Sequence, residues 1–168
     1  MNKVLFYIDS MQKGGANRVM ANLVDYFTNK DFDVILVNDI GSNDDYPEYE
    51  VNSLAKRIIL NESGANAIIS NLKRIKKLRK IILEEKPNCV LSFMGPPNVR
   101  MLFATVFLPC RKVVSVRNDP NREYGENIIK KFMTNCIFLL ADGCVFQTED
   151  ASKYFFNRIR RKSTIIVN

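Results

Sequence analysis

Val4-Leu-Phe-Tyr-Ile8, followed by Asp9-Ser-Met-Gln-Lys-Gly14-Gly15, is the stretch that decides the fold. Its apolar residues form an uninterrupted run, which is typical of a β-strand covered on both faces. A turn containing the two glycines then leads into a segment with apolar residues at helical spacing, namely Val19, Met20, Leu23, Tyr26 and Phe27. A buried strand that passes through a glycine turn into an amphipathic helix predicts the first half of a strand–helix–strand unit.

The same alternation continues to the end of the chain. Further apolar runs predict strands at 34–37, 57–60, 89–93, 112–116, 144–146 and 164–167. Helical stripes lie between them: Ile68, Leu72, Ile75, Leu78 and Ile82; Val99, Leu102, Phe103 and Val106; Ile129, Phe132, Met133, Cys136, Ile137 and Leu140. Residues 41–49 are acidic and rich in turn formers, which predicts a surface loop. Such repeats predict one α/β domain over 1–168, a Rossmann-like parallel sheet of about seven strands with helices on both faces.

Composition excludes several classes of function. The chain has no histidine, so histidine zinc sites and Ser-His or Cys-His catalysis are excluded. Cys89, Cys110, Cys136 and Cys144 lack metal-type spacing and are predicted to be reduced core thiols. No signal peptide and no apolar run long enough to cross a bilayer are visible, which predicts a cytoplasmic protein.

Basic residues outnumber acidic ones, giving a formal net charge of +7. Much of the excess lies at 73–86 and a smaller part at 158–162. In the helix expected at 67–86, the basic face is most simply a solvated outer face. A sharper interpretation is docking to an anionic membrane surface, at the inner face of the membrane. A nucleic-acid partner is not expected, because no reading motif accompanies the charges.

Four loops are expected at the carboxyl edge of the sheet, where α/β folds bind ligands. In the first, Gly14, Gly15 and Ala16 allow close approach, and helix amides there favour a phosphate or diphosphate, with Arg18 one turn on. A tight turn without a ligand explains the glycines equally well. Their spacing matches neither the dinucleotide fingerprint nor the Walker P-loop.

The remaining loops supply polar side chains. Gly95 permits close approach, and Asn98 can bond a sugar hydroxyl, although helix capping explains both as well. Arg117 could grip a phosphate, and Asp119, beside Asn118, could orient or deprotonate a hydroxyl. The alternative there is an ordinary Asn-Asp-Pro turn. At 147–150, Thr148 is predicted to cap a helix that begins with acidic residues, Glu149 among them.

The ordered motifs resemble family 4 of the retaining glycosyltransferases with the GT-B fold. They are Lys3 to Ser10 with Gly14-Gly15-Ala16-x-Arg18-Val19, Ser92-Phe93-Met94 with Asn98, Ser115 to Pro120, Ala141-Asp142-Gly143 and Gln147-Thr148-Glu149. The similarity covers essentially the whole chain and is greatest to enzymes of capsule, exopolysaccharide and lipid-linked oligosaccharide assembly.

The resemblance implies transfer of a sugar from a nucleotide-diphosphate donor to a glycan or lipid-linked acceptor, without a metal or other cofactor. This chain corresponds to the N-terminal, acceptor-side domain. The C-terminal donor-binding domain, with its paired glutamates, is expected to be absent, so the fragment alone is expected to be inactive. Gly14, Gly15, Ala16, Arg18, Gly95, Asn98, Arg117, Asn118 and Glu149 are the implied acceptor or diphosphate contacts.

Two departures from the family bear on the site. Many relatives have Glu where this chain has Asn17, and some carry a His near Arg117, which leaves Asp119 as the catalytic candidate. The alternative function is a stand-alone, non-catalytic binding or regulatory module with the same fold. An oxidoreductase domain ranks third, because the dinucleotide fingerprint is lacking.

Overall fold

A seven-stranded, fully parallel sheet forms the centre of the computed structural model, which describes residues 2–41 and 47–167. Residues 42–46 of the predicted loop at 41–49 lie outside the described residues, as does Asn168 at the end of the chain. The strand order is β3-β2-β1-β4-β5-β6-β7, which confirms the predicted Rossmann-like fold. The strands are β1 Lys3–Ile8, β2 Asp33–Asn38, β3 Lys56–Ile59, β4 Cys89–Phe93, β5 Arg111–Val116, β6 Gly143–Phe146 and β7 Ser163–Ile165.

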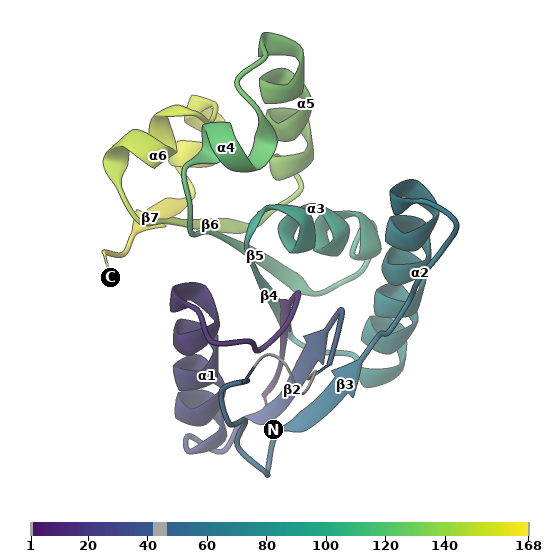
Figure 1. Ribbon diagram of the computed structural model, residues 1–168. Helices are drawn as coiled ribbons and strands as arrows, with labels where there is room; N and C mark the ends of the chain where they lie inside the picture. Colours follow the sequence, from purple (N-terminus) through teal and green to yellow (C-terminus); the bar gives the residue numbers. More distant parts are fainter. Residues whose placement is uncertain (1, 42–46, 168) are drawn as a thin grey trace.

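The helices cover the sheet on both faces (Figure 1). They are α1 Gly15–Thr28, α2 Ala67–Glu85, α3 Gly95–Ala104, α4 Pro120–Tyr124, α5 Ile128–Phe138, α6 Glu149–Lys153 and α7 Asn157–Arg160. Residues of α1 share one hydrophobic core with β1 and β2, whereas residues of α2, α3, α5 and α7 belong to a second core on the opposite face. Each strand of the central pair contributes alternate side chains to the two cores, as a doubly covered strand must.

The carboxyl ends of all strands lie along one edge, because every pairing is parallel. From β1 the chain moves outward through α1 to β2, and from β4 it moves the other way through α3 to β5. The pair β1–β4 is therefore the point where strand order reverses. This arrangement places the four predicted loops side by side along one edge, since β1, β4, β5 and β6 are consecutive neighbours.

Helix α5 has the opposite orientation to the one predicted. Its buried residues are Thr134, Asn135 and Phe138. Four residues of the predicted apolar stripe, Ile129, Phe132, Met133 and Cys136, face outward, whereas Ile137 packs against the core. Asn135 explains the inward polar face, because its side chain donates to the Tyr154 carbonyl at 3.2 Å and accepts from the Phe156 amide at 2.6 Å. The predicted apolar stripe is present on α5, but most of it faces away from the core.

In the long helix α2, only the second half of the predicted apolar stripe is buried. Leu78, Ile81 and Ile82 are buried, whereas Ile68 and Leu72 are exposed near the start of the helix. Part of its basic face makes contacts within the protein: Lys77 donates to the Leu60 carbonyl at 2.6 Å, and Arg79 donates to the carbonyls of Ala104 and Val106. None of the described helices combines the length and hydropathy needed to cross a bilayer.

The four cysteines are free thiols, as predicted. Cys110 and Cys144 are buried, and burial raises the pKa of both thiols. Cys136 lies on the outward face of α5, so the prediction that all four are core residues is wrong for this residue.

A buried polar network lies near the carboxyl end of β1, close to the point where the strand order reverses. Arg100 of α3 pairs with Asp39, which follows β2, and its Nε donates to the Tyr7 hydroxyl at 2.8 Å. That hydroxyl donates to Asp39 Oδ1 at 2.6 Å, and Asn71 of α2 accepts from Arg100 Nη1 at 2.8 Å. Burial raises the pKa of Tyr7, so its hydroxyl remains protonated and can donate to the carboxylate. The network joins β1, β2, α2 and α3 at the carboxyl edge of the sheet.

Replacing Arg100 by Met is expected to lower the free energy of unfolding by about 3 kcal/mol, because the buried Asp39 carboxylate loses its close partner and keeps the more distant Arg74, whose Nε lies 3.9 Å away. The double variant Asp39→Asn/Arg100→Met should lose clearly less than the two single variants summed. Urea denaturation of the four proteins measures this coupling. Strictly additive losses would contradict the inferred pairing.

Lys86, directly after α2, occupies the left-handed region with φ 50°. Lys86→Gly is expected to stabilise the protein by up to about 1 kcal/mol, because glycine adopts this conformation without a Cβ clash. Lys80→Gly within the same helix is the matched control and should destabilise by about 1 kcal/mol. Thermal and urea unfolding report both changes. A destabilising Lys86→Gly would show that the lysine side chain, not its backbone, matters there.

Candidate functional site

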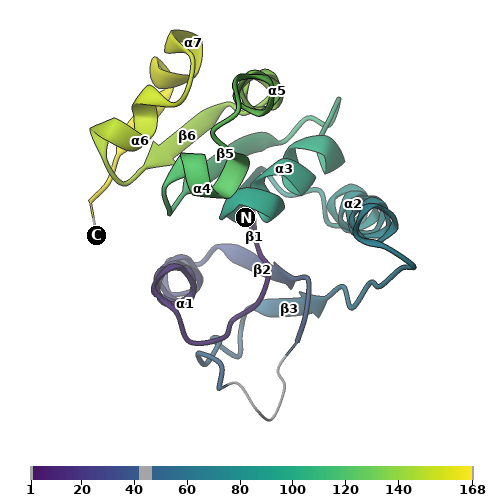
Figure 2. The ribbon, with the colours of Figure 1, turned by 45° about the horizontal axis from the view of Figure 1, so that its top comes forward.

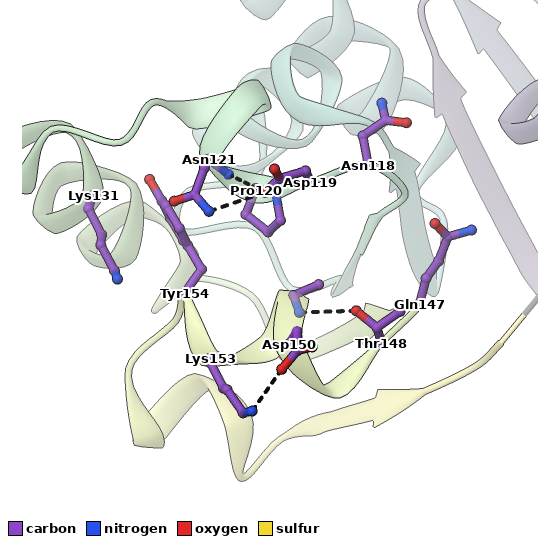
Figure 3. A pocket seen from close by; sticks show the side chains of 11 residues that line it. Asn118, Asp119, Pro120, Asn121, Lys131, Gln147, Thr148, Asp150, Lys153 and Tyr154 are labelled. Atoms are coloured by element: carbon purple, nitrogen blue, oxygen red, sulfur yellow. Dashed lines mark hydrogen bonds and ion pairs between the residues drawn. The ribbon is translucent and has the colours of Figure 1, made fainter.

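A pocket of about 560 Å³ opens at the carboxyl edge between the loops that follow β5 and β6 (Figure 3). It is lined by Asn118, Asp119, Pro120, Asn121, Lys131, Gln147, Thr148, Asp150, Ala151, Lys153 and Tyr154. Amide, hydroxyl, carboxylate and ammonium groups are set among apolar surface in this lining, so the pocket offers donors and acceptors to a polyhydroxylated ligand. The structure thus brings together the third and fourth predicted loops.

Asp119 lies on the pocket wall and begins helix α4. Its Oδ1 accepts hydrogen bonds from the Asn121 backbone amide at 2.9 Å and from Asn121 Nδ2 at 3.2 Å (Figure 3). Both bonds use the same oxygen, which is the geometry of an N-cap. The ordinary turn role is therefore present, and the predicted action of Asp119 on a hydroxyl stays a prediction.

Two lysines set the charge of the pocket. Lys153 donates to Asp150 at 2.7 Å, and this bond lowers the pKa of the aspartate and raises that of the lysine. Lys131, from α5, places its ammonium 5.0 Å from the centre of the Tyr154 ring. The Asp150–Lys153 pair is internally balanced, so Asp119 and Lys131 contribute the remaining opposite charges to the lining.

Glu123 of α4 is a carboxyl group that the sequence analysis did not single out. Its Oε1 accepts from Asn118 Nδ2 at 2.7 Å, which orients a pocket residue. Burial raises the pKa of Glu123, although bonds from Asn118 and from the Gly95 amide oppose the rise. Glu123 itself is not a lining residue of the pocket, so its place in the site is to orient Asn118.

Glu123 also explains the glycine at position 95. A Cβ on Gly95 would lie 3.3 Å from the Cβ of Glu123, so α4 packs directly against the start of α3. The close approach that Gly95 permits is therefore made by α4. The predicted contact of Gly95 with a ligand stays untested.

Asn98 is fully buried and bonds only to protein groups among the described residues. Its Oδ1 accepts from the Ser92 hydroxyl at 2.7 Å, and its Nδ2 donates to the Ser115 carbonyl and the Tyr124 hydroxyl. Both amide hydrogens are thus used to join β4, β5 and α4. This geometry favours a role in holding the strand ends over the predicted bond to a sugar hydroxyl.

Arg117 lies at the carboxyl end of β5 and is 7% exposed. Its guanidinium carbon is 5.1 Å from the centre of the Phe93 ring, and burial lowers the pKa of the group. The side chain therefore lies against the core next to the pocket and is not one of its lining residues.

The glycine loop lies at the same edge but outside this pocket. Helix α1 begins at Gly15 without a side-chain cap, and a Cβ on Gly15 would meet nothing within 4 Å. The segment before β3 holds this loop in place, since the Lys13 amide donates to the Pro47 carbonyl at 3.0 Å. Ala16 and Arg18 belong to the first turn of this helix, and Arg18 is exposed. The open, uncapped helix start suits the predicted anion.

Glu149 is exposed at the first position of α6 and faces a separate, smaller hollow with Ser152 and Arg160. Thr148 accepts from the Ala151 amide at 3.1 Å, which confirms the predicted cap. Over the residues that the structure describes, no group of histidine, cysteine, aspartate and glutamate side chains could hold a metal ion.

Lys131 and Tyr154 are pocket residues that the sequence analysis missed. Lys131 comes from α5 and Tyr154 follows α6, so neither belongs to the predicted loops after β5 and β6. Lys131 reaches the pocket because α5 turns its apolar stripe outward. Lys131 could have been placed in the pocket from the sequence only if the orientation of α5 had been predicted correctly.

Comparison with known proteins gives a consistent result for the fold. No family model matches the chain. An uncharacterized glycosyltransferase of Methanocaldococcus jannaschii is 27% identical over 129 residues, which cover 67% of this chain and 32% of that protein. The sucrose-phosphate synthase of Thermosynechococcus elongatus superposes with a TM-score of 0.75 at 9% identity, covering 99% of this chain and 48% of that one.

A UDP-GlcNAc 2-epimerase of Methanocaldococcus jannaschii also superposes, with a TM-score of 0.62 at 13% identity over 99% of this chain and 45% of that one. The chain spans about a third of the curated relative and under half of these two structures. At such identities the structural likeness shows the fold alone. The chain therefore has the Rossmann-like domain fold of GT-B proteins, and its curated relative supports a place among glycosyltransferases of this type.

Proposed function

We propose that this domain is the acceptor-binding half of a retaining glycosyltransferase of family 4, acting in the cytoplasm on glycan or lipid-linked acceptors of cell-surface polysaccharide. The observation that carries the proposal is the polar pocket between the β5 and β6 loops, with Asp119 on its wall. The curated glycosyltransferase relative and the order of the family-like motifs support it.

In this proposal the pocket holds the acceptor. Asn118, Asn121 and Gln147 bond sugar hydroxyls, and Asp119 orients the hydroxyl that attacks the donor sugar. Oδ1 of Asp119 caps α4, which fixes the carboxylate in one orientation on the pocket wall. A fixed carboxylate loses little orientational freedom when the acceptor binds, and that preorganisation favours reaction.

The donor is a nucleotide-diphosphate sugar, bound mainly by a second domain and without a metal. The uncapped start of α1 at Gly15 directs backbone amides toward the developing charge of the leaving diphosphate. The epimerase that shares this fold is named for a sugar nucleotide, UDP-GlcNAc, which supports a ligand of this class. Because a UDP-GlcNAc 2-epimerase has this fold, epimerisation is tested beside sugar transfer.

Assays with the protein that the complete gene encodes separate these functions. A panel of nucleotide sugars is incubated with glycan and lipid-linked acceptors, and nucleotide diphosphate release and sugar transfer are measured. Acceptor-dependent release supports the transferase. Inversion at the sugar C2 without release supports the epimerase, and neither reaction supports a non-catalytic binding module.

Asp119→Asn is expected to lower kcat by about 10²-fold while stability stays unchanged, because asparagine caps a helix as well as aspartate but carries no charge. Steady-state kinetics and thermal unfolding give the two readouts. Asp31→Asn, an exposed residue in the turn after α1, is the matched control. Full activity in Asp119→Asn would remove Asp119 from the mechanism.

Gly15→Leu is expected to fold normally, because its Cβ would enter open space, yet to raise the KM for the sugar nucleotide at least about tenfold. The added side chain would occupy the position proposed for the diphosphate. Gly15→Ala is the graded comparison and should have a smaller effect. An unchanged KM in Gly15→Leu would place the diphosphate elsewhere.

A further inference from the structure

The outward face of α5 is an apolar surface with no described element packed over it. We define the α5 patch as Ile128, Ile129, Phe132, Met133, Cys136 and Phe156. Ile128 is 81% exposed, Phe132 60% and Met133 58%. The rings of Phe132 and Phe156 lie 6.0 Å apart, which extends the patch from α5 to the start of α7. Contiguous exposed apolar side chains of this size mark an interaction surface.

The patch is a built feature of α5 and not a loosely packed helix. Asn135 anchors the opposite side of the helix through its bonds to the 154–156 segment, and Phe138 is fully buried. The Asn127 side chain caps the helix start by accepting from the Ile129 amide at 2.8 Å. Figure 2 shows α5 almost end-on at the outer rim of the molecule. The exposed side chains of Ile129, Phe132 and Met133 are therefore presented to the outside in a fixed orientation.

The charges beside the patch are mainly basic, and Glu126, exposed two residues before Ile128, is the acidic exception. Helices α5 and α7 carry Lys130, Lys131, Arg158 and Arg160, and neither contains an acidic residue. Arg158 and Arg160 are exposed, as is Arg161 directly after α7. An apolar stripe with long aliphatic and aromatic side chains and a cationic border matches the interface of an anionic bilayer, where the ring and alkyl groups enter the acyl boundary and the cations meet phosphate.

We infer that the α5 patch, with its basic border on α7, docks this domain on an anionic lipid bilayer. The helix lies in the plane of the interface, since its 11 residues are too short to cross a membrane. This assigns membrane contact to α5 and α7 in place of the basic face predicted for α2, where Lys77 and Arg79 are used within the protein. The inference stands apart from sugar transfer and needs no substrate for its test.

One consequence does rest on the proposed function. Lys131 of α5 lines the β5–β6 pocket, and its neighbours on the outer side of the helix form the patch. Docking through the patch would therefore place the pocket beside the lipid headgroups. That position suits an acceptor whose sugar is attached to a membrane-embedded lipid.

The test is flotation of the full chain with phosphatidylcholine vesicles, with and without about a third of phosphatidylglycerol. The wild type should float with the anionic vesicles only. Ile129→Ser/Phe132→Ser/Met133→Ser should reduce the bound fraction at least about tenfold, with unchanged circular dichroism because these side chains are exposed. Leu54→Ser/Phe107→Ser, two exposed apolar residues on other segments, is the matched control and should bind like the wild type.

A second pair of variants separates the two basic regions. Lys130→Gln/Arg158→Gln/Arg161→Gln should weaken binding and its salt dependence, whereas Lys76→Gln/Lys80→Gln on α2 should leave both unchanged. Wild-type-like flotation of the triple serine variant would overturn the inference. Loss of vesicle binding in Lys76→Gln/Lys80→Gln alone would also overturn the inference. Self-association through the patch, with no binding to vesicles, would assign it to a second copy of the chain and would equally overturn membrane docking.

Discussion

Parallel pairing of β1 with β4 is the constraint on which the rest of the structure depends. Since these neighbouring strands run in one direction while their connections lead to opposite sides, α1 covers one face and α2 to α7 cover the other. All ligand-facing loops then share one edge. The buried contacts among Tyr7, Asp39 and Arg100 fix β1, β2 and α3 at this reversal, so the loops have a rigid base.

The polar residues at this edge divide between two tasks. Asn98 and Glu123 hold the strand ends and helix starts together through bonds within the protein. Asn118, Asp119 and Lys131 line the open pocket. Buried polar groups must be satisfied internally, so a residue such as Asn98 supports the site by stiffening it. The pocket lies between the ends of β5 and β6, beyond the β1–β4 reversal point, and α4 beside it packs on the start of α3 at Gly95.

Helix α5 links the pocket to the outer surface. Its inward face is built from Thr134, Asn135 and Phe138, and this choice turns a lysine toward the pocket and an apolar stripe toward solvent. Exposing that stripe has a free-energy cost in water, which covering by a bilayer would remove. The orientation of α5 therefore determines both that Lys131 lines the pocket and that the surface beside the pocket is apolar.

The sequence by itself determined the order of elements, the parallel sheet and the position of the loops, because apolar runs and helical periods are local signals and crossovers are right-handed. It also identified Asp119 and Asn118 as pocket residues through their place after β5. Only the tertiary structure decided which side of α5 faces inward, that Asn98 is fully buried, and that Glu123 approaches Gly95. Periodicity shows that a helix has an apolar face, but the partner of that face is settled by packing between segments distant in the chain.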